Sequence, residues 1–238
     1  MKVLSCVVYL HFNDSFDDLD IQSKELRGAI AGLCPNEILL HHHYEDGTFK
    51  YNYPLIQYKH VQKRCLIVGI EQGAKVIYGL DLLGKALLLF HQEYRILKKD
   101  LLFQESPYGI TNAILSYSFL TPWLALNEKN YEKYQKLGSW QKKKQLLENI
   151  LIANIISISK SLKYTVPRPI QANIVKIKGV PTSLKGTPML GFLGTFSVNF
   201  EIPDYWGIGK SVSRGFGTVK RISSEEAHGS YSQQKKAF

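Results

Sequence analysis

The sequence predicts an α+β protein made of two tandem modules, each with its strands and helices in the order βαββαβ. Alternating apolar segments typical of strands recur between stretches in which apolar residues have helical spacing. A charge cluster, Lys98-Lys99-Asp100, and the Ser106-Pro107 step mark the start of a second module. The βαββαβ order is that of the ferredoxin-like (RRM-like) fold. We therefore expect tandem ferredoxin-like domains that end in a C-terminal glycine-rich loop.

The first module, residues 1–98, begins with a strand and a helix. Val3–Phe12 runs apolar and alternates, which predicts a strand. After an acidic stretch, apolar residues return at the spacing of a helix, namely Leu19, Leu26, Ile30 and Leu33. The next two β-prone segments, 37–44 and 53–68, flank a hairpin turn signal at Glu45-Asp46-Gly47.

The first module closes with a helix and a strand. Residues Glu71–Leu83 can form a short helix, and Ala86–Leu97 reads as the last strand. With the elements before them, these two complete the first βαββαβ unit.

The second module, residues 99–222, begins with an extended segment at Tyr108–Leu126, in which Pro122 indicates an edge or a bend. Asn127 is suited to cap a long helical region that runs to about residue 160 and is interrupted near Gly138. Two further strands are expected at 170–177 and 189–200, before the glycine-rich loop. Residues 223–238 are polar and basic, and we expect them to form a frayed tail.

The charge balance indicates an anionic partner. The chain carries 30 Lys and Arg against 20 Asp and Glu, a formal net charge of +10, which raises the local concentration of anions. Nucleic acid is the leading candidate, and a membrane surface is the alternative. The chain has no uninterrupted apolar stretch of roughly 18 residues, and its N-terminus feeds a strand rather than a signal peptide. We therefore expect a cytoplasmic protein without a membrane partner.

The cysteines and histidines do not indicate a metal site. Cys6, Cys34 and Cys65 form no CxxC pair, so neither a zinc site nor a disulfide framework is expected. The seven histidines include no HExxH motif. We expect buried thiols, no bound metal and no cofactor.

A glycine-rich loop near the C-terminus predicts a phosphate-binding surface. Glycine lets backbone amides approach an anion closely and allows positive φ. Two cations add charge, and one aromatic ring could stack on a base. These residues are Gly207, Gly209, Lys210, Arg214, Gly215, Phe216 and Gly217. The alternative is a glycine-rich hairpin that only bends the chain.

A nucleotide-binding P-loop fits this segment less well. Gly209-Lys210-Ser211 matches the end of the P-loop pattern, but Asp204 stands where the pattern has its first glycine. A P-loop also opens an apolar helix, whereas the residues that follow here disfavour a helix.

The histidine triplet is the candidate for catalysis. His41-His42-His43 follows an apolar segment, and on a strand His41 and His43 would point to the same face. Two imidazoles with a pKa near 6.5 can act as general base and general acid at neutral pH. This is the chemistry of metal-free ribonucleases, in which the ribose 2′-hydroxyl attacks and a cyclic phosphate is left. A polar strand end, a chance metal site or packing are the alternatives.

Five stretches of the chain belong together: Leu40-His41-His42-His43, the YPLIQYK string at 53–59, Val68-Gly69-Ile70, Gly73-Ala74 and the loop GIGKSVSRGFGTV. Together they resemble one known family, the CRISPR-associated endoribonucleases of Cas class six, and within it the b-type branch. The resemblance spans roughly residues 1–222, and the YPLIQYK string and the glycine loop are its most specific parts. The resemblance implies metal-independent cleavage of the CRISPR precursor transcript within each repeat.

The resemblance also implies site residues. A His-x-His pair of the family maps onto His41 and His43, with a role for His42 and the division between acid and base left open. The glycine loop would hold the RNA backbone through Lys210 and Arg214. By their nearness in sequence, Lys50 and Lys59 are expected to stabilise the pentavalent transition state.

Three functions stay open at this point. The first is a repeat-specific endoribonuclease, the second a repeat-RNA-binding subunit of a CRISPR complex that does not cut, and the third a nonspecific nucleic-acid binder. The expected partner is CRISPR repeat RNA. Other CRISPR-associated proteins of an interference complex and a homodimer are further candidate partners.

Overall fold

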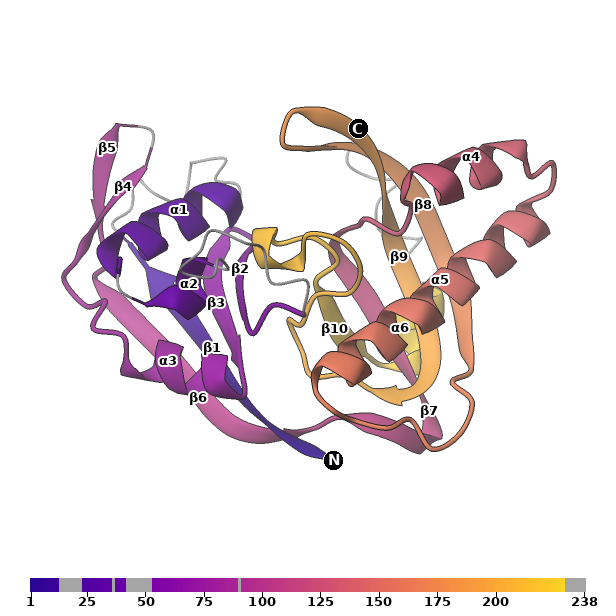
Figure 1. Cartoon of the computed structure of the whole chain (residues 1–238), viewed down its shortest axis with the longest axis horizontal. Helices are drawn as coiled ribbons and strands as arrows, with labels where there is room; N and C mark the ends of the chain where they lie inside the picture. Colours follow the sequence, from indigo (N-terminus) through magenta and orange to yellow (C-terminus); the bar gives the residue numbers. More distant parts are fainter. Residues whose placement is uncertain (13–22, 36, 42–52, 90, 230–238) are drawn as a thin grey trace. The chain divides into compact units, whose positions relative to one another are not determined.

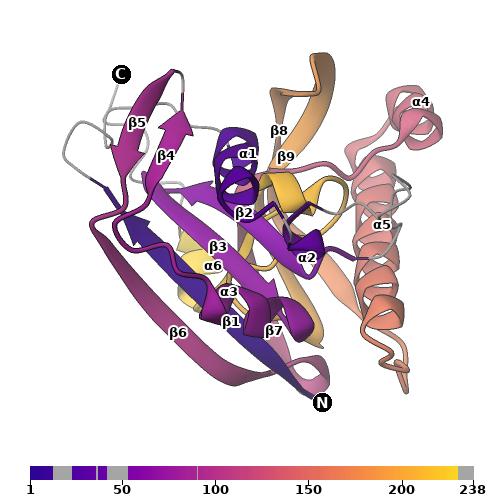
Figure 2. The ribbon, with the colours of Figure 1, turned by 60° about the vertical axis from the view of Figure 1, so that its left-hand side comes forward.

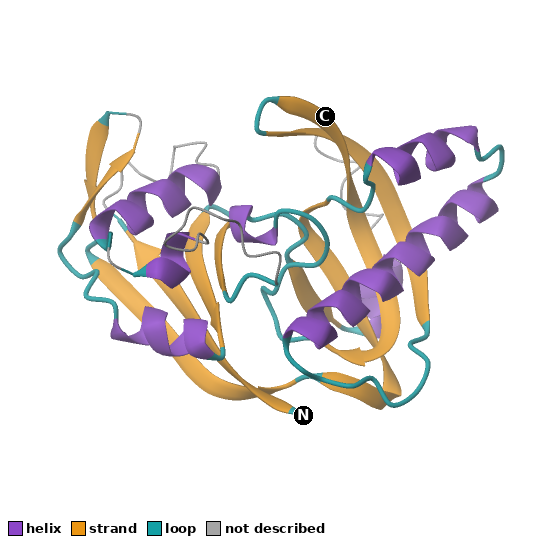
Figure 3. Cartoon of the chain, in the orientation of Figure 1, coloured by secondary structure: helices purple, strands orange, loops and turns teal. Residues whose placement is uncertain are grey.

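The computed structural model describes residues 1–12, 23–35, 37–41, 53–89 and 91–229. The contacts within the chain define two compact units. The N-terminal unit holds Lys2–Ser106 together with Ser211–Gly215, and the C-terminal unit holds Met1, Pro107–Lys210 and Phe216–Phe238. Each unit contains one four-stranded sheet with helices, which confirms the predicted α+β class (Figures 1 and 3).

The N-terminal sheet has the strand order β2-β3-β1-β6, as in a ferredoxin-like domain. β3 pairs antiparallel with both β1 and β2, with Val7 opposite Val68 and Lys59 opposite Leu66. The strands of this sheet are β1 (Lys2–His11), β2 (Ile56–Val61), β3 (Arg64–Ile70) and β6 (Lys98–Pro107).

Helices α1 (Ser23–Leu33) and α3 (Gln72–Gly79) flank the sheet of this unit (Figure 2). Their apolar sides are buried in one core with the sheet. Leu26 of α1 and Ile77 of α3 belong to this core together with Val8 of β1. The helical spacing read from the sequence therefore gives α1 its buried face.

The segment expected as a strand at 37–44 instead begins with a short helix, α2 (Ile38–His41). Glu37 starts this turn, because its carbonyl oxygen accepts from the Leu40 N–H (3.0 Å) and its Oε1 accepts from the Leu39 N–H (3.4 Å). A short apolar run does not by itself distinguish a strand from a helix. The strand prediction was wrong at these residues for that reason.

The last strand of the first module also differs from the prediction. Residues 86–97 hold a separate hairpin of β4 (Ala86–Leu89) and β5 (Gln92–Arg95). The fourth strand of the sheet is β6, where the charge cluster had suggested a boundary. β6 lies at the edge of the sheet, and edge strands commonly carry exposed charges that discourage pairing with other chains. The charged residues at the start of β6 therefore read as a boundary between modules, although they begin a strand.

The C-terminal sheet repeats the order, as β10-β7-β9-β8. Its strands are β7 (Gly109–Trp123), β8 (Ala172–Leu184), β9 (Thr187–Glu201) and β10 (Val219–Ile222). The pairing of β7 with β9 shifts register between Phe119 and Trp123, around the proline expected to mark a bend. The glycine loop with its 3-10 turn η2 (Val212–Arg214) connects β9 to β10, where the N-terminal unit has α3.

The long helical region forms α4 (Glu128–Lys136) and α5 (Trp140–Ser161), interrupted as predicted around Gly138. Asn127 caps α4 by accepting a hydrogen bond from the Asn130 N–H (2.8 Å), and this confirms the predicted N-cap.

A last helix, α6 (Ser224–Gly229), forms where we expected a polar tail. Ser223 and Glu226 make a capping box: the Ser223 N–H donates to Glu226 Oε2 (2.8 Å) and the Glu226 N–H donates to Ser223 Oγ (3.1 Å). The helix is held to the sheet through Thr195 of β9, whose hydroxyl donates to the Ala227 carbonyl (3.3 Å). In the described part of the chain, no helix is both long and apolar enough to cross a membrane.

Candidate functional site

The two ends of the glycine loop, residues 207–210 and 216–217, are fastened to β7 and the residues that follow it in the C-terminal unit. The Gly217 N–H donates to the Pro122 carbonyl (2.9 Å), the Ile208 N–H to the Gly217 carbonyl (2.8 Å) and the Lys210 N–H to the Leu124 carbonyl (3.3 Å). Gly217 has φ +62, and a Cβ there would overlap the Ile208 carbonyl oxygen. These amides are occupied by carbonyls of the chain itself, so charge at this part of the loop comes from the exposed Lys210 side chain.

The middle of the loop, residues 211–215, belongs to the N-terminal unit and contains η2. Ser211 (φ 59) and Gly215 (φ 89) flank this turn in the left-handed conformation. A Cβ at Gly215 would overlap the hydroxyl of Ser23, the first residue of α1. The Ser23 hydroxyl in turn accepts from the His60 N–H of β2 (3.0 Å). The turn is therefore seated closely on α1 next to β2.

Lys59 of β2 links the sheet to η2 through a hydrogen bond. Its Nζ donates to the Val212 carbonyl (3.1 Å), and the residue is 0% exposed. Burial lowers the pKa of Lys59 to about 7 because a charged amine is costly away from water. With no exposed surface, the Lys59 amine contacts the backbone of the turn.

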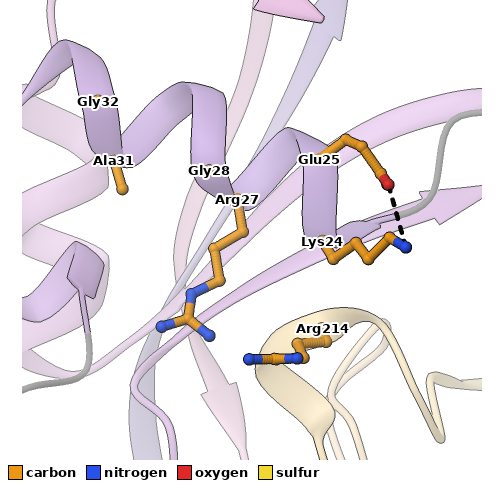
Figure 4. A pocket seen from close by; sticks show the side chains of 7 residues that line it. All are labelled: Lys24, Glu25, Arg27, Gly28, Ala31, Gly32 and Arg214. Carbon is orange, nitrogen blue, oxygen red and sulfur yellow. Dashed lines mark ion pairs between the residues drawn. The ribbon is translucent and has the colours of Figure 1, made fainter. Parts of the chain in front are cut away.

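Arg27 of α1 and Arg214 of η2 point toward the same space (Figure 4). This space is a groove with a volume of about 560 Å³. The residues that line it are Lys24, Glu25, Arg27, Gly28, Ala31, Gly32 and Arg214. Burial, and then the positive charge of Arg214, lower the pKa of the Arg27 guanidinium. Two guanidinium groups that repel each other favour an anion between them.

The residue before the histidine triplet lies in the same unit as this groove. The Tyr58 hydroxyl donates to the Leu40 carbonyl at the end of α2 (3.4 Å), and both residues are fully buried. Burial raises the pKa of Tyr58, and the nearby charge of Arg27 opposes that rise. Tyr58 thus hydrogen-bonds to the end of α2 and interacts electrostatically with Arg27.

The histidines are described only in part. His41 is the last residue of α2, so the strand alternation that placed His41 and His43 on one face does not apply at His41. His42, His43 and Lys50 lie outside the described residues. Among the residues that the structure does describe, no three or more His, Cys, Asp or Glu side chains are grouped as metal ligands.

The other predicted site residues divide between the two units. Lys59 and Arg214 belong to the N-terminal unit, whereas Lys210 and the half-buried Phe216 belong to the C-terminal unit. Sequence reasoning passed over Arg27, because a single arginine on an amphipathic helix reads as a solvated charge. Two glycines on the same helix were the available signal that this side of α1 is open.

Family models match both halves of the chain. The Cas6b N-terminal domain matches residues 6–106, and the Cas6b C-terminal domain matches residues 109–222. An uncharacterized protein of Methanocaldococcus jannaschii is 41% identical over 138 residues, which are 58% of this chain and 93% of that protein.

Solved structures agree with this match. A crystal structure of Cas6b is 35% identical, with a TM-score of 0.81 over 93% of this chain and 100% of that one. A second crystal structure, that of the CRISPR RNA processing endoribonuclease Cas6b, is 32% identical, with a TM-score of 0.72 over the same shares. Csf5, a type IV Cas6 crRNA endonuclease, shares the fold at 9% identity, with a TM-score of 0.61 over 94% of this chain and 100% of that one.

Both halves of the chain thus match a Cas6b domain, and the whole matches solved Cas6b structures at more than 30% identity. The tandem ferredoxin-like fold predicted from the element order is the fold of these proteins, and the chain belongs to the Cas6b family.

Proposed function

We propose that this protein is a metal-independent endoribonuclease that cuts CRISPR precursor RNA within its repeats and so releases guide RNAs. The observation that carries the proposal is the 32% identity to the CRISPR RNA processing endoribonuclease Cas6b, whose crystal structure this chain matches over its full length. The net charge of +10 supports an RNA substrate.

The reaction needs a base and an acid on either side of one phosphodiester. The base removes the proton of the ribose 2′-hydroxyl, and the 2′-oxygen attacks the adjacent phosphorus. The bond from phosphorus to the 5′-oxygen breaks as the acid protonates that oxygen, leaving a 2′,3′-cyclic phosphate and a 5′-hydroxyl. We assign these two roles to His41 and His43, and His42 is the alternative member of the pair.

The placement of α2 supports this assignment. His41 follows Leu40, whose carbonyl accepts from Tyr58, and Lys59, the next residue of β2, holds the η2 turn that carries Arg214. We further propose that Lys210 and Arg214 contact the RNA backbone and that Phe216 offers a stacking surface. For Lys59 we propose a positioning role, because its amine is buried against the Val212 carbonyl.

The test is cleavage of the cognate repeat RNA in EDTA, with binding measured on the same samples. The wild type should cut, and His41→Ala or His43→Ala should slow cutting by about 10²–10⁴-fold, the usual contribution of a general acid or base. Binding should be retained in both variants. His91→Asn is the matched control, since His91 is exposed at a turn with φ 67, which asparagine tolerates.

Two outcomes count against the proposal. Cleavage that stops in EDTA and returns with a divalent cation would show that the reaction requires a metal. RNA that is bound by the wild type and remains intact would identify the protein as a repeat-RNA-binding subunit.

A further inference from the structure

We infer that the groove between α1 and η2 binds one phosphodiester of the RNA strand, held by Arg27 from one side and Arg214 from the other. This inference rests on the proposed function, which supplies the RNA. Arg27 is not part of the predicted glycine loop, so the inference adds a second segment of the chain to the RNA site.

The charges in the groove favour an anion. Three cations, Lys24, Arg27 and Arg214, line it together with one carboxylate, Glu25. Lys24 pairs with that carboxylate, with 3.3 Å between Nζ and Oε1. In Figure 4 this pair lies at one end of the groove, and the two guanidinium groups extend into the space away from it. The two guanidinium groups are therefore the positive charges that face this space.

The two arginines interact with each other before any ligand is present. The charge of Arg214 is one of the causes that lower the pKa of Arg27, which places the two groups within electrostatic range. Holding like charges together costs free energy, and a phosphodiester between them would turn that repulsion into two attractions. Guanidinium groups also match the oxygen pairs of phosphate with two parallel hydrogen bonds.

The shape of α1 leaves room for a nucleic-acid backbone. Gly28 and Gly32 are exposed and line the groove one helical turn apart, and a Cβ at either would meet nothing within 4 Å. Each glycine inside a helix costs about 1 kcal/mol relative to alanine, so helix stability does not account for them. Because the two glycines have no side chains, the backbone of α1 is uncovered beside Arg27, and a sugar-phosphate chain can lie close to it.

The position of Arg214 is set by groups that do not touch the ligand. Lys59 holds the Val212 carbonyl, and the Arg214 N–H donates to the Ser211 carbonyl (2.9 Å). The close fit of Gly215 on Ser23 fixes the other end of η2. A side chain on so firmly held a turn can meet a phosphate with little loss of conformational entropy.

The experiment measures binding of repeat RNA at several salt concentrations in a His41→Ala, His43→Ala background, in which the RNA should stay intact. Arg27→Gln and Arg214→Gln should each weaken binding about 5- to 20-fold and lower the slope of log K against log salt by about 0.7, the value for one phosphate contact on a single strand. The double variant should lose less than the product of the two single losses, because both arginines hold the same phosphate.

Controls separate this effect from charge and folding. Arg64→Gln removes an exposed arginine of β3 that does not line the groove, and it should change binding less than 2-fold, as expected of a charge outside the contact. Arg27→Lys keeps the charge but not the paired hydrogen bonds, and it should recover only part of the affinity. The melting temperature of each arginine variant is measured to show that the fold is kept.

Each remaining result has a defined meaning. If Arg27→Gln and Arg64→Gln behave alike while the wild type cuts repeat RNA, the groove inference is wrong and the proposed function stands. If the wild type does not bind repeat RNA even at low salt, both fail. If inorganic phosphate raises the melting temperature of the wild type but not of Arg27→Gln, and RNA binding is unchanged in that variant, the groove takes free phosphate and the RNA assignment is overturned.

Discussion

Lys59 is a predicted site residue whose amine the structure buries against the chain itself. Its amine is fully buried and donates to a backbone carbonyl of η2. Sequence position suggested direct contact with the transition state, because Lys59 follows the histidine triplet in the chain. β-strand alternation instead turns Tyr58 into the core and Lys59 toward η2, and burial then changes the amine's titration.

The pKa of Lys59 predicts a pH dependence of stability. Burial lowers this pKa from 10.5 to about 7. Below about pH 7 the amine is protonated in both states. Between that pH and 10.5 the unfolded chain binds a proton that the folded chain does not, so the unfolding free energy rises with pH, by up to about 1.4 kcal/mol per pH unit.

Lys59→Met isolates this contribution. The stability of the wild type relative to Lys59→Met should increase from pH 7 to pH 10, because all other titrating groups are common to both proteins. Urea unfolding across this range measures the difference. A difference that stays constant with pH would show that Lys59 titrates normally in the folded protein.

At the scale of elements, two side chains of α5, Lys144 and Glu148, hydrogen-bond to the edge strand β8. Glu148 is 8% exposed, and its Oε1 accepts from the Ile174 N–H of β8 (2.9 Å) and lies 3.6 Å from Lys144 Nζ. The strand order places β8 at the edge of the sheet, where an N–H can point away from the ladder. The helix thus supplies the acceptor that the sheet lacks.

Substitution of Glu148 should separate this hydrogen bond from the ion pair. Glu148→Leu should destabilise the protein by about 1–3 kcal/mol, because the Ile174 N–H is left buried without its acceptor. Glu148→Gln keeps an acceptor and should cost less. Lys144→Met removes the partly exposed ion-pair partner together with its exposed hydrogen bond to Asn173 Oδ1 (2.9 Å), and it should cost less than about 1 kcal/mol. Urea denaturation ranks the three, and equal losses for Leu and Gln would contradict this account.

At the scale of the whole molecule, the two units are not two consecutive pieces of chain. Residues 211–215 come from the end of the sequence but belong to the N-terminal unit. A cut after residue 106 therefore removes part of that unit, including the Val212 carbonyl that accepts from Lys59.

A fragment of residues 1–106 tests this division. It should be less stable than the full chain, and the pH-dependent difference between wild type and Lys59→Met should disappear in it, because water reaches the amine once η2 is absent. Denaturation of both fragments from pH 7 to pH 10 gives the answer. A fragment that keeps the pH-dependent difference of the full chain would show that η2 does not cause the burial of Lys59.

Local patterns predicted much of the architecture. The helical spacing of α1, the cap at Asn127 and the break near Gly138 depend on residues close together in sequence, and such signals can be read without the fold. Where a short apolar run could become either a strand or a helix, as at α2, the prediction was wrong. The capping box of α6 was a readable signal that the polar composition of the tail concealed.

By itself, the sequence determined the α+β class, the two repeated modules, the basic charge, the glycine loop and the family resemblance, because each depends on composition, periodicity or short motifs. Only the tertiary structure decided that β6 completes the first sheet, that Lys59 is buried beneath η2, and that Arg27 faces Arg214. These features arise where segments distant in the chain pack together. Burial and electrostatic interaction depend on distance in space, which the order of residues does not contain.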